Sequence, residues 1–298
     1  MVHAAECHVS RGAQQRLGLL RDLMASGRFI TYEPTSLVVV NGKVQPASEQ
    51  GIRQDLATLR PRFDGLVTYG AIHGLEALPA IAESLGFRAL LVGVWDPDDA
   101  QELDAALAAA RAHPKLVLGI VLGNEIVFRR SSSMQGLALR LHALHMRAPT
   151  LLLAASEPFH LFNAGDATGV LAESDVLLPN IHPIYQSWFK PGNGERQAAE
   201  FVRNVVGDLH RLYCGPVLVK ETGEPSGPAS GGYSAANQAL FWQALRDTLP
   251  ASRDAAFSYF AAYDLPWRAQ DGGLESEAHW GLLDAQRHDK QSLRELAP

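Results

Sequence analysis

Short runs of apolar residues alternate with amphipathic stretches along almost the whole chain of 298 residues. Most of these runs are continuously apolar, as expected for strands of a parallel sheet whose two faces are both covered. We therefore predict eight strands, at residues 29–32, 65–69, 89–94, 116–122, 150–155, 176–181, 217–220 and 256–262.

The stretches between these runs carry helix signals. The apolar residues of 49–59 recur at the spacing of one helix face, and Ser48 before them is a suitable N-cap. Asp98 and Ser234 are predicted to cap two further helices in the same way. Residues 196–213 form another amphipathic stretch. The pattern is thus strand, helix, strand throughout.

Eight such units favour an α/β fold, a (β/α)8 TIM barrel that forms one catalytic domain over residues 1–298. Residues 1–28 precede the first strand as an N-terminal extension, and the amphipathic stretch 11–24 predicts an extra helix at the base of the barrel. A doubly wound open sheet is the alternative, and it usually carries a glycine-rich phosphate loop. Neither G-x-G-x-x-G nor G-x-x-x-x-G-K-[ST] occurs in the sequence.

Composition narrows the class of protein. Hydrophobic residues make up 47% of the chain and charged residues 19%, which is enough to bury a sizeable core. The net charge of −6 and the lack of a basic run argue against nucleic acid as a partner. No apolar stretch is long enough to span a membrane. No signal peptide is recognisable, so the compartment stays open: cytoplasmic for the chain as written, periplasmic if a leader was removed.

Neither a cofactor nor a metal is predicted. Cys7 and Cys214 have no spacing signature, and we expect free thiols rather than a disulfide or a metal site. His73 and His182 lack the H-x-H or H-E-x-x-H spacing of zinc ligands. No G-x-S-x-G elbow is present, which argues against a serine nucleophile.

Two glutamates follow buried runs at the ends of predicted strands. Glu125 follows the fourth strand and Glu221 the seventh, and in this fold chemistry collects where strand ends meet the next loops. Glycoside cleavage with retention needs two carboxyl groups about 5–5.5 Å apart, one as acid/base and one as nucleophile. We therefore predict that Glu125 and Glu221 face each other as the catalytic pair. Asn124 would hydrogen-bond a substrate hydroxyl or the nucleophile.

Aromatic, carboxylate and amide side chains follow the other strand ends. Aromatic rings stack on the C–H faces of sugars, while amides and carboxylates bind their hydroxyls. The scarcity of positive charge at these ends argues against a phosphorylated substrate. We expect the substrate to contact Tyr32, Tyr69, Asn124, Glu157, His182, Tyr185, Glu224, Asp264 and Trp267.

The ordered set of motifs resembles glycoside hydrolase family 17, in its bacterial type, from about Phe29 to Lys290. The motifs are "LGNE" at 122–125, "ETG-x-PS" at 221–226, "DLPW" at 264–267 and "HWGLLDAQR" at 279–287, with weaker likeness at 52–70 and 156–162. The resemblance implies a retaining enzyme with Glu125 as acid/base and Glu221 as nucleophile. It further implies a β-1,3-glucan substrate, oligo- or polysaccharide, for an endo-1,3-β-glucosidase or a β-glucan transglycosylase.

Two departures keep other interpretations open. Glu224 stands where the family usually has tryptophan, and Lys220 stands where a small residue is common. The same mechanism on β-1,2, β-1,4 or β-1,6 linkages is one alternative. A barrel that binds glucan without cleaving it is another. Protein partners and endo or exo action are not indicated by the sequence.

Overall fold

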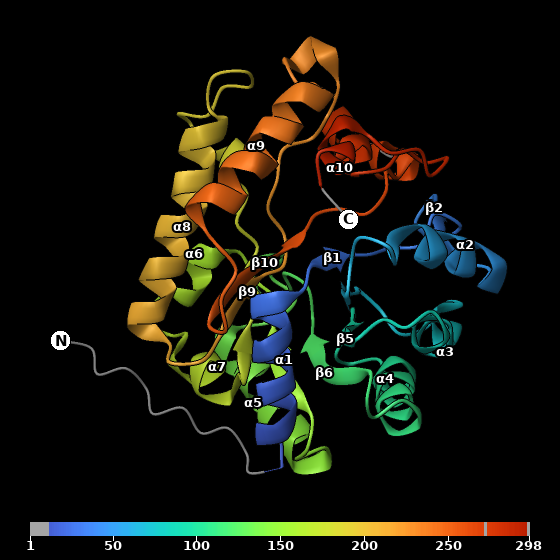
Figure 1. The fold of residues 1–298 in the computed structure, drawn as a ribbon. Coiled ribbons are helices and arrows are strands. Elements are labelled where there is room, and N and C mark those ends of the chain that lie inside the picture. Colours follow the sequence, from blue (N-terminus) through green and yellow to red (C-terminus); the bar gives the residue numbers. More distant parts are fainter. Residues whose placement is uncertain (1–11, 271–272, 297–298) are drawn as a thin grey trace.

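The computed structural model describes residues 12–270 and 273–296, in which eight parallel strands form a closed barrel (Figure 1). Phe29 at its first strand is in register with Gly65 on one side and with Ser258 on the other, which closes the barrel. The predicted TIM barrel is therefore confirmed. In chain order its strands are β1 (Phe29–Thr31), β4 (Gly65–Val67), β5 (Ala89–Val94), β6 (Val117–Leu122), β7 (Leu152–Ala155), β8 (Val176–Leu177), β9 (Val217–Val219) and β10 (Ala255–Tyr259).

Helices follow the strands on the outside, and Figure 1 shows α8 and α9 packed side by side there. The longer helices are α1 (Gln14–Ser26), α2 (Glu49–Leu59), α3 (Leu78–Ser84), α4 (Ala100–Ala112), α5 (Met134–Arg147), α8 (Glu195–Leu212) and α9 (Ala235–Thr248). The shorter ones are α6 (Phe159–Phe162), α7 (Thr168–Glu173) and α10 (Gln291–Arg294). Single 3-10 turns are η1 (Leu75–Ala77), η2 (Pro183–Tyr185), η3 (Ala229–Gly231), η4 (Pro266–Ala269) and η5 (Glu275–His279).

Two of the three predicted helix caps are confirmed. The hydroxyl of Ser48 accepts a hydrogen bond from the amide of Gly51 at the start of α2, and the hydroxyl of Ser234 caps α9 in the same way. The prediction for Asp98 is wrong by one residue. Asp99 caps α4, because the Asp98 carboxylate instead forms an ion pair with an arginine of α5.

Helix α1 covers the base of the barrel, as the sequence suggested. Leu20, Leu23 and Met24 on α1 are buried in one apolar cluster with strand residues such as Leu91 and Leu218. The helix ends three residues before β1 begins, so it lies at the end of the barrel where the strands start. The opposite end, where the strands finish, stays available for chemistry.

A two-stranded antiparallel hairpin, which the strand prediction missed, follows β1. It consists of β2 (Val38–Val40) and β3 (Lys43–Gln45). Asn41 and Gly42 connect the strands with φ angles of 49° and 71°, as a two-residue turn of this kind requires. The Asn-Gly pair between valine-rich strands was a usable signal.

The predicted sixth strand is shorter than expected. Only Val176–Leu177 forms β8, and residues 178–181 continue as irregular chain. This segment still lies between its neighbours, because Asn180 forms isolated bridges with Pro158 on one side and with Glu221 on the other. It therefore links the ends of β7 and β9 at the barrel mouth.

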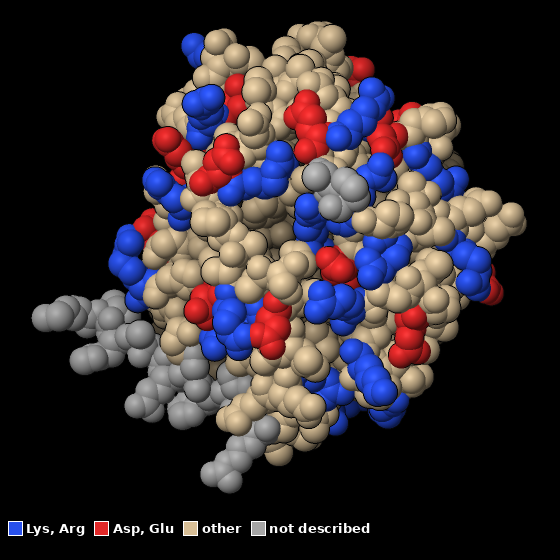
Figure 2. All heavy atoms as spheres, viewed as in Figure 1, with Lys and Arg blue, Asp and Glu red and all other residues tan. Residues whose placement is uncertain are grey.

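The surface and the cysteines add three facts. No helix within residues 12–270 and 273–296 is long and apolar enough to cross a bilayer. Basic and acidic side chains are interspersed over the face drawn in Figure 2. Cys214 is disulfide-bonded, so the expectation of a free thiol there is wrong, and Cys7 lies outside the described residues.

Candidate active site

The end of β6 turns sharply and presents Glu125 at the barrel mouth. Gly123 has a φ of 75° and Glu125 a φ of 57°, so both lie in the left-handed region of backbone angles that residues other than glycine rarely adopt. The amide of Glu125 donates to the carbonyl of Ser156 at the end of β7 over 2.8 Å, which holds the turn. Such backbone strain is typical of functional positions.

Glu125 and Glu221 line the same cavity, which has a volume of about 450 Å³. Asn180 connects them. Its side-chain amide donates to Oε1 of Glu125 over 2.9 Å, and its backbone forms a bridge with Glu221. The structure therefore brings the ends of strands β6 and β9 to one cavity through the segment that follows β8.

Three side chains hold the carboxylate of Glu221. The Tyr69 hydroxyl donates to Oε1 over 2.8 Å, Nε2 of His182 lies 3.3 Å from Oε2, and Nζ of Lys220 lies 3.8 Å from Oε1. Burial alone would raise the pKa of Glu221, but the His182 hydrogen bond, the Lys220 charge and the Tyr69 hydroxyl together lower it to about 2. Glu221 is consequently ionised at neutral pH.

Asn124 lies beside this pair with its amide oxygen fully engaged. Oδ1 accepts from Nζ of Lys220 over 2.7 Å and from the hydroxyl of Ser156 over 3.1 Å. The Asn180 amide approaches the same oxygen at 3.4 Å. The contacts of Asn124 are thus with the protein, and its NH2 group is the part left for a ligand.

Glu157 holds the loop that follows Glu125. It is completely buried, and its two carboxylate oxygens accept the backbone amides of Val127 and Phe128 over 2.8 and 3.2 Å. Burial raises its pKa to about 7, although both amides act in the opposite direction. These contacts position the Glu125 loop, while substrate contact by Glu157 stays a prediction.

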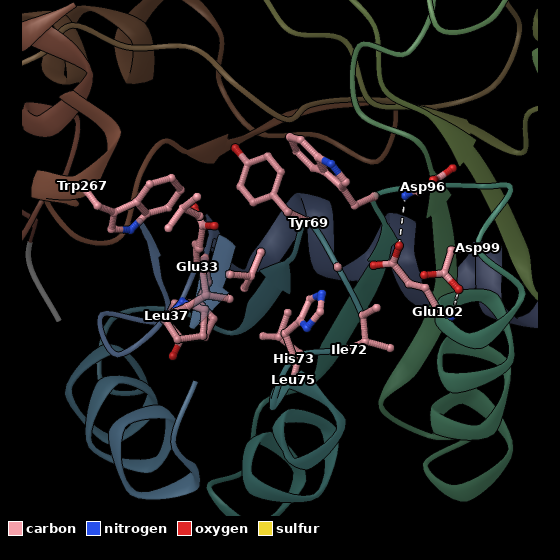
Figure 3. Close-up of a pocket in the computed structure, with 16 residues that line it drawn as sticks. Glu33, Leu37, Tyr69, Ile72, His73, Leu75, Asp96, Asp99, Glu102 and Trp267 are labelled. Carbon is pink, nitrogen blue, oxygen red and sulfur yellow. Dashed lines mark hydrogen bonds between the residues drawn. The ribbon is translucent and has the colours of Figure 1, made fainter. Parts of the chain in front are cut away.

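A second cavity of about 430 Å³ lies next to the first, across Tyr69. Figure 3 shows Trp267 on one side of it, Glu102 on the other and Tyr69 between them. Val39 and Val44 of the hairpin add an apolar wall. The carboxylate of Glu102 already accepts backbone amides, so the free surface of this cavity is largely aromatic and aliphatic.

Three further members of the predicted substrate-binding set also have protein partners. The hydroxyl of Tyr32 donates to Asp55 over 2.9 Å, although its ring borders the second cavity. The hydroxyl of the exposed Tyr185 donates to Glu277 over 2.7 Å at the rim of the first cavity. Asp264 accepts from Nζ of Lys290 over 2.6 Å. Substrate contact by these three stays a prediction.

Glu224 is the unusual member of the predicted set. Its side chain is completely buried, and neither carboxylate oxygen has a hydrogen-bond partner among the described residues. Burial, together with a smaller effect of the Glu195 charge, raises its pKa to about 8. Glu224 is not part of the lining of either cavity, so the structure gives no support for a direct sugar contact.

The family is decided by comparison with known proteins. The sequence model of the BtgE/BtgC glycoside hydrolase domain matches residues 30–281. The chain belongs to this family. The barrel just described is therefore a glycoside hydrolase domain, and the likeness to family 17 is more distant.

Two curated fungal proteins are similar to this glycoside hydrolase domain. The probable beta-glucosidase btgE of Aspergillus flavus is 26% identical over 250 residues, which cover 80% of this chain and 40% of that protein. The chain thus spans about two fifths of the length of this relative. The glucan 1,3-beta-glucosidase of Schizosaccharomyces pombe is 23% identical over 259 residues, covering 80% of this chain and 79% of that protein.

Solved structures share the fold. An active-site mutant of the Rhizomucor miehei beta-1,3-glucanosyltransferase, in complex with laminaritriose, superposes with a TM-score of 0.69 at 22% identity, covering 89% of this chain and 96% of that one. A beta-1,3-glucanase and pollen allergen of Cryptomeria japonica gives 0.65 at 11% identity, covering 89% and 97%. At these identities the likeness establishes the barrel alone.

The structure of this glycoside hydrolase domain also reveals site residues that the prediction left out. Asn180 contacts Glu125, Arg268 lines the first cavity and pairs with Glu33, and Trp280 packs against His182. Asn180 lies beyond the last regular residue of its strand, and Arg268 directly follows the "DLPW" motif. Among the described residues, no group of three or more His, Cys, Asp or Glu side chains is arranged to bind a metal ion.

Proposed function

We propose that this domain is a retaining glycosidase or transglycosylase that acts on β-glucan, most favourably on β-1,3 linkages. The observation that carries the proposal is that Glu125 and Glu221 line one cavity at the mouth of the barrel. Cleavage with retention requires this arrangement, because one carboxyl group attacks the sugar from one face while the other protonates the leaving group.

Glu221 is the nucleophile in this proposal. A nucleophilic carboxylate has to stay ionised, and the low pKa of Glu221, about 2, meets this requirement over the whole neutral range. The carboxylate attacks the anomeric carbon, the glycosidic C–O bond breaks, and a covalent glycosyl-enzyme forms. The hydrogen bonds from Tyr69 and His182 fix the oxygens of Glu221 for this attack.

Glu125 is the acid/base. In the first step its carboxyl group protonates the leaving oxygen, and in the second its carboxylate takes a proton from water or from a sugar hydroxyl, which then releases the glycosyl group. Its partner Asn180 and the strained turn at the end of β6 orient its side chain towards the cavity. A water acceptor gives hydrolysis, and a sugar acceptor gives transfer.

The relatives support a β-glucan as substrate. The Schizosaccharomyces pombe protein is named a glucan 1,3-beta-glucosidase, and an active-site mutant of the Rhizomucor miehei enzyme has a solved structure in complex with laminaritriose. The aromatic residues Trp267, Trp95 and Tyr69 around the second cavity suit the C–H faces of such a chain.

Product analysis across a panel of linkage-defined β-glucan oligosaccharides tests the function. We expect wild type to shorten or lengthen laminari-oligosaccharides, with the β-anomer as first product by NMR. Glu221→Gln should abolish turnover, and Glu125→Gln should lower kcat/KM by about 10²–10⁴-fold. The loss in Glu125→Gln should be much smaller on a dinitrophenyl glucoside, whose leaving group needs no proton.

Three other outcomes separate the alternatives. Activity confined to β-1,2, β-1,4 or β-1,6 oligosaccharides would move the domain to another linkage with the mechanism intact. Binding without turnover on any substrate, unchanged by Glu125→Gln, would identify a glucan-binding barrel. An α-anomeric first product would exclude retention and the nucleophilic role of Glu221.

A further inference from the structure

Lys220 is a buried lysine at the centre of the candidate active site. It directly precedes Glu221 at the end of β9, and only 1% of its surface is exposed. A lysine is almost never buried to this degree without a partner, because removing its charge from water costs several kcal/mol. Its surroundings therefore need to be identified group by group.

The ammonium group of Lys220 has three neighbours. Nζ lies 2.7 Å from Oδ1 of Asn124, 3.8 Å from Oε1 of Glu221 and 4.3 Å from the centre of the Tyr69 ring. These neighbours come from the ends of three different strands, β6, β9 and β4. Lys220 thus connects the residue before the proposed acid/base with the proposed nucleophile.

The contact with Asn124 fixes the orientation of its amide group. Donors from Lys220, Ser156 and Asn180 all converge on Oδ1, so the oxygen of this amide faces the protein. Among the described residues, no group accepts a hydrogen bond from Nδ2 of Asn124. This nitrogen is also not completely buried. Asn124 itself is not part of the lining of either cavity, but its neighbours Glu125 and Asn180 line the first one, and its NH2 group is available to donate beside them.

The charge of Lys220 also acts on Glu221. Burial lowers the pKa of Lys220 to about 8, while the carboxylates of Glu221, Glu125 and Glu157 attract its proton and Arg268 repels it. At neutral pH the ammonium is therefore still charged, and it faces a carboxylate that the same charge helps to keep ionised. His182 and Tyr69 hold that carboxylate from its other sides.

We propose that Lys220 is a positioning residue of the active site, which orients the Asn124 amide towards a substrate hydroxyl and keeps Glu221 ionised. The inference rests on the proposed role of Glu221 as nucleophile. It explains one of the two residues that depart from the expected motif. It also predicts two separable effects, one on sugar binding through Asn124 and one on the acid limb of the pH profile through Glu221.

Two variants separate these effects. Lys220→Met removes the charge and the donor at similar length, and Lys220→Gln removes the charge but keeps a donor for Asn124. In both, the acid limb of kcat/KM should move upwards by about one pH unit, towards the ordinary glutamate value. Only Lys220→Met should also raise KM markedly, and its kcat/KM should fall by about 10- to 100-fold. Arg62→Met is the matched control, because it removes a cation paired with Asp289 that borders neither cavity.

A double-mutant cycle tests whether Lys220 acts through Asn124. If it does, Lys220→Met should cost much less kcat/KM in an Asn124→Ala background than in wild type. Equal losses in both backgrounds, together with an unmoved acid limb, would overturn the proposal. A lysine that merely packs the core would change stability without moving either of these measurements.

A substrate-free measurement keeps the inference separate from the proposed function. Wild type should lose stability as pH falls from about 4.5 towards 2, because Glu221 is protonated less easily when folded than when unfolded. Glu221→Gln should remove that part of the pH dependence, and Lys220→Met should make it smaller, because a folded pKa nearer to the unfolded one leaves less stability to lose. If wild type has no turnover but this reduction is seen, the proposed function fails and the contact between Lys220 and Glu221 stands. If turnover is seen without the reduction, the Lys220 proposal fails alone.

Discussion

The side-chain amide of Asn180 donates to Oε1 of Glu125 over 2.9 Å, across the ends of two barrel strands that are not adjacent in the sheet. The residue that makes this contact lies in irregular chain, yet its backbone is held on both sides by the segments after β7 and β9. The side chain is held as well, because its Oδ1 accepts from the hydroxyl of Ser156 over 3.3 Å. Its position sets the direction in which Glu125 points.

Replacing Asn180 should impair the acid/base step more than binding. In Asn180→Ala, Glu125 loses its donor, and we expect kcat to fall by about 10- to 100-fold, with a smaller change in KM. The loss should be larger on a glucoside with a poor leaving group than on a dinitrophenyl glucoside, since only the former needs the proton. Equal losses on both substrates would contradict a role through Glu125.

Trp267 should bind sugar without taking part in the chemistry. It lies on the wall of the second cavity and is not part of the lining of the first, where the two glutamates lie. Trp267→Ala should therefore raise KM for laminari-oligosaccharides by about 2- to 10-fold and leave kcat nearly unchanged, as expected for uniform loss of binding. Leu139→Ala, at an exposed apolar residue of α5, is the control. An unchanged KM would mean that the second cavity holds no sugar.

The sequence predicts the barrel well because most of its strands are buried on both faces, so most leave a continuous apolar run. The hairpin at 38–45 does have an apolar run, Val38–Val40, and an Asn-Gly turn in its sequence. The pattern of eight barrel units does not predict it, because its two short strands pair with each other outside the barrel sheet. Asp98 and Asp99 are equally good caps in the sequence. A tertiary contact of Asp98 with Arg140 decides between them.

The residues of the candidate site also divide into those that the sequence predicts and those that it does not. Glu125 and Glu221 are predictable because a strand end in this fold has a known location. Asn180 is not, because it lies three residues beyond the end of β8, and its direction depends on neighbours distant in sequence. Lys220 and Glu224 look like simple departures from a motif. Their burial, and the partners that one has and the other lacks, follow only from the packed structure.

Glu224 should lower the stability of the domain at neutral and alkaline pH. Burial raises its pKa to about 8 from the ordinary value of 4.5, so the folded protein holds this proton in a range where the unfolded chain has lost it. Stability should therefore decrease as pH rises from about 4.5 to about 8, where the full cost of the buried charge is reached. Glu224→Gln removes this pH-dependent loss of stability. We expect its stabilising effect, measured by urea unfolding, to be about 1–3 kcal/mol larger at pH 8 than at pH 5.

The control for Glu224→Gln is an exposed glutamate, Glu200→Gln on α8. It should shift stability by less than about 0.5 kcal/mol at either pH, because surface substitutions have small effects. If Glu224→Gln changes stability as little as this control at both pH values, the Glu224 carboxyl group is in contact with water, and the predicted cost of burying its charge is excluded. Enzymatic activity serves as a second measurement, since the structure gives Glu224 no contact with a cavity.

His145 should stabilise the fold at acidic pH, far from the barrel mouth. Its ring nitrogens lie 3.1 Å from Oε2 of Glu173 and 3.1 Å from Oδ2 of Asp175, linking α5 to the segment around α7 and β8. Burial alone would lower its pKa, but the two carboxylates together raise it. Because the folded value is the higher one, the stabilisation is complete below the unfolded pKa of about 6.5 and is lost as pH rises through the folded value.

His145→Gln should therefore destabilise the domain by about 1 kcal/mol more at pH 5 than at pH 8.5. The measurement is urea unfolding at both values, with activity on laminari-oligosaccharides as a check that the barrel mouth is unaffected. His210→Gln is the matched control, since this partly buried histidine lies in the last turn of α8 and its ring contacts a backbone carbonyl rather than a carboxylate. A loss of the same size at both pH values would show that His145 contributes by packing and hydrogen bonding alone, without its charge.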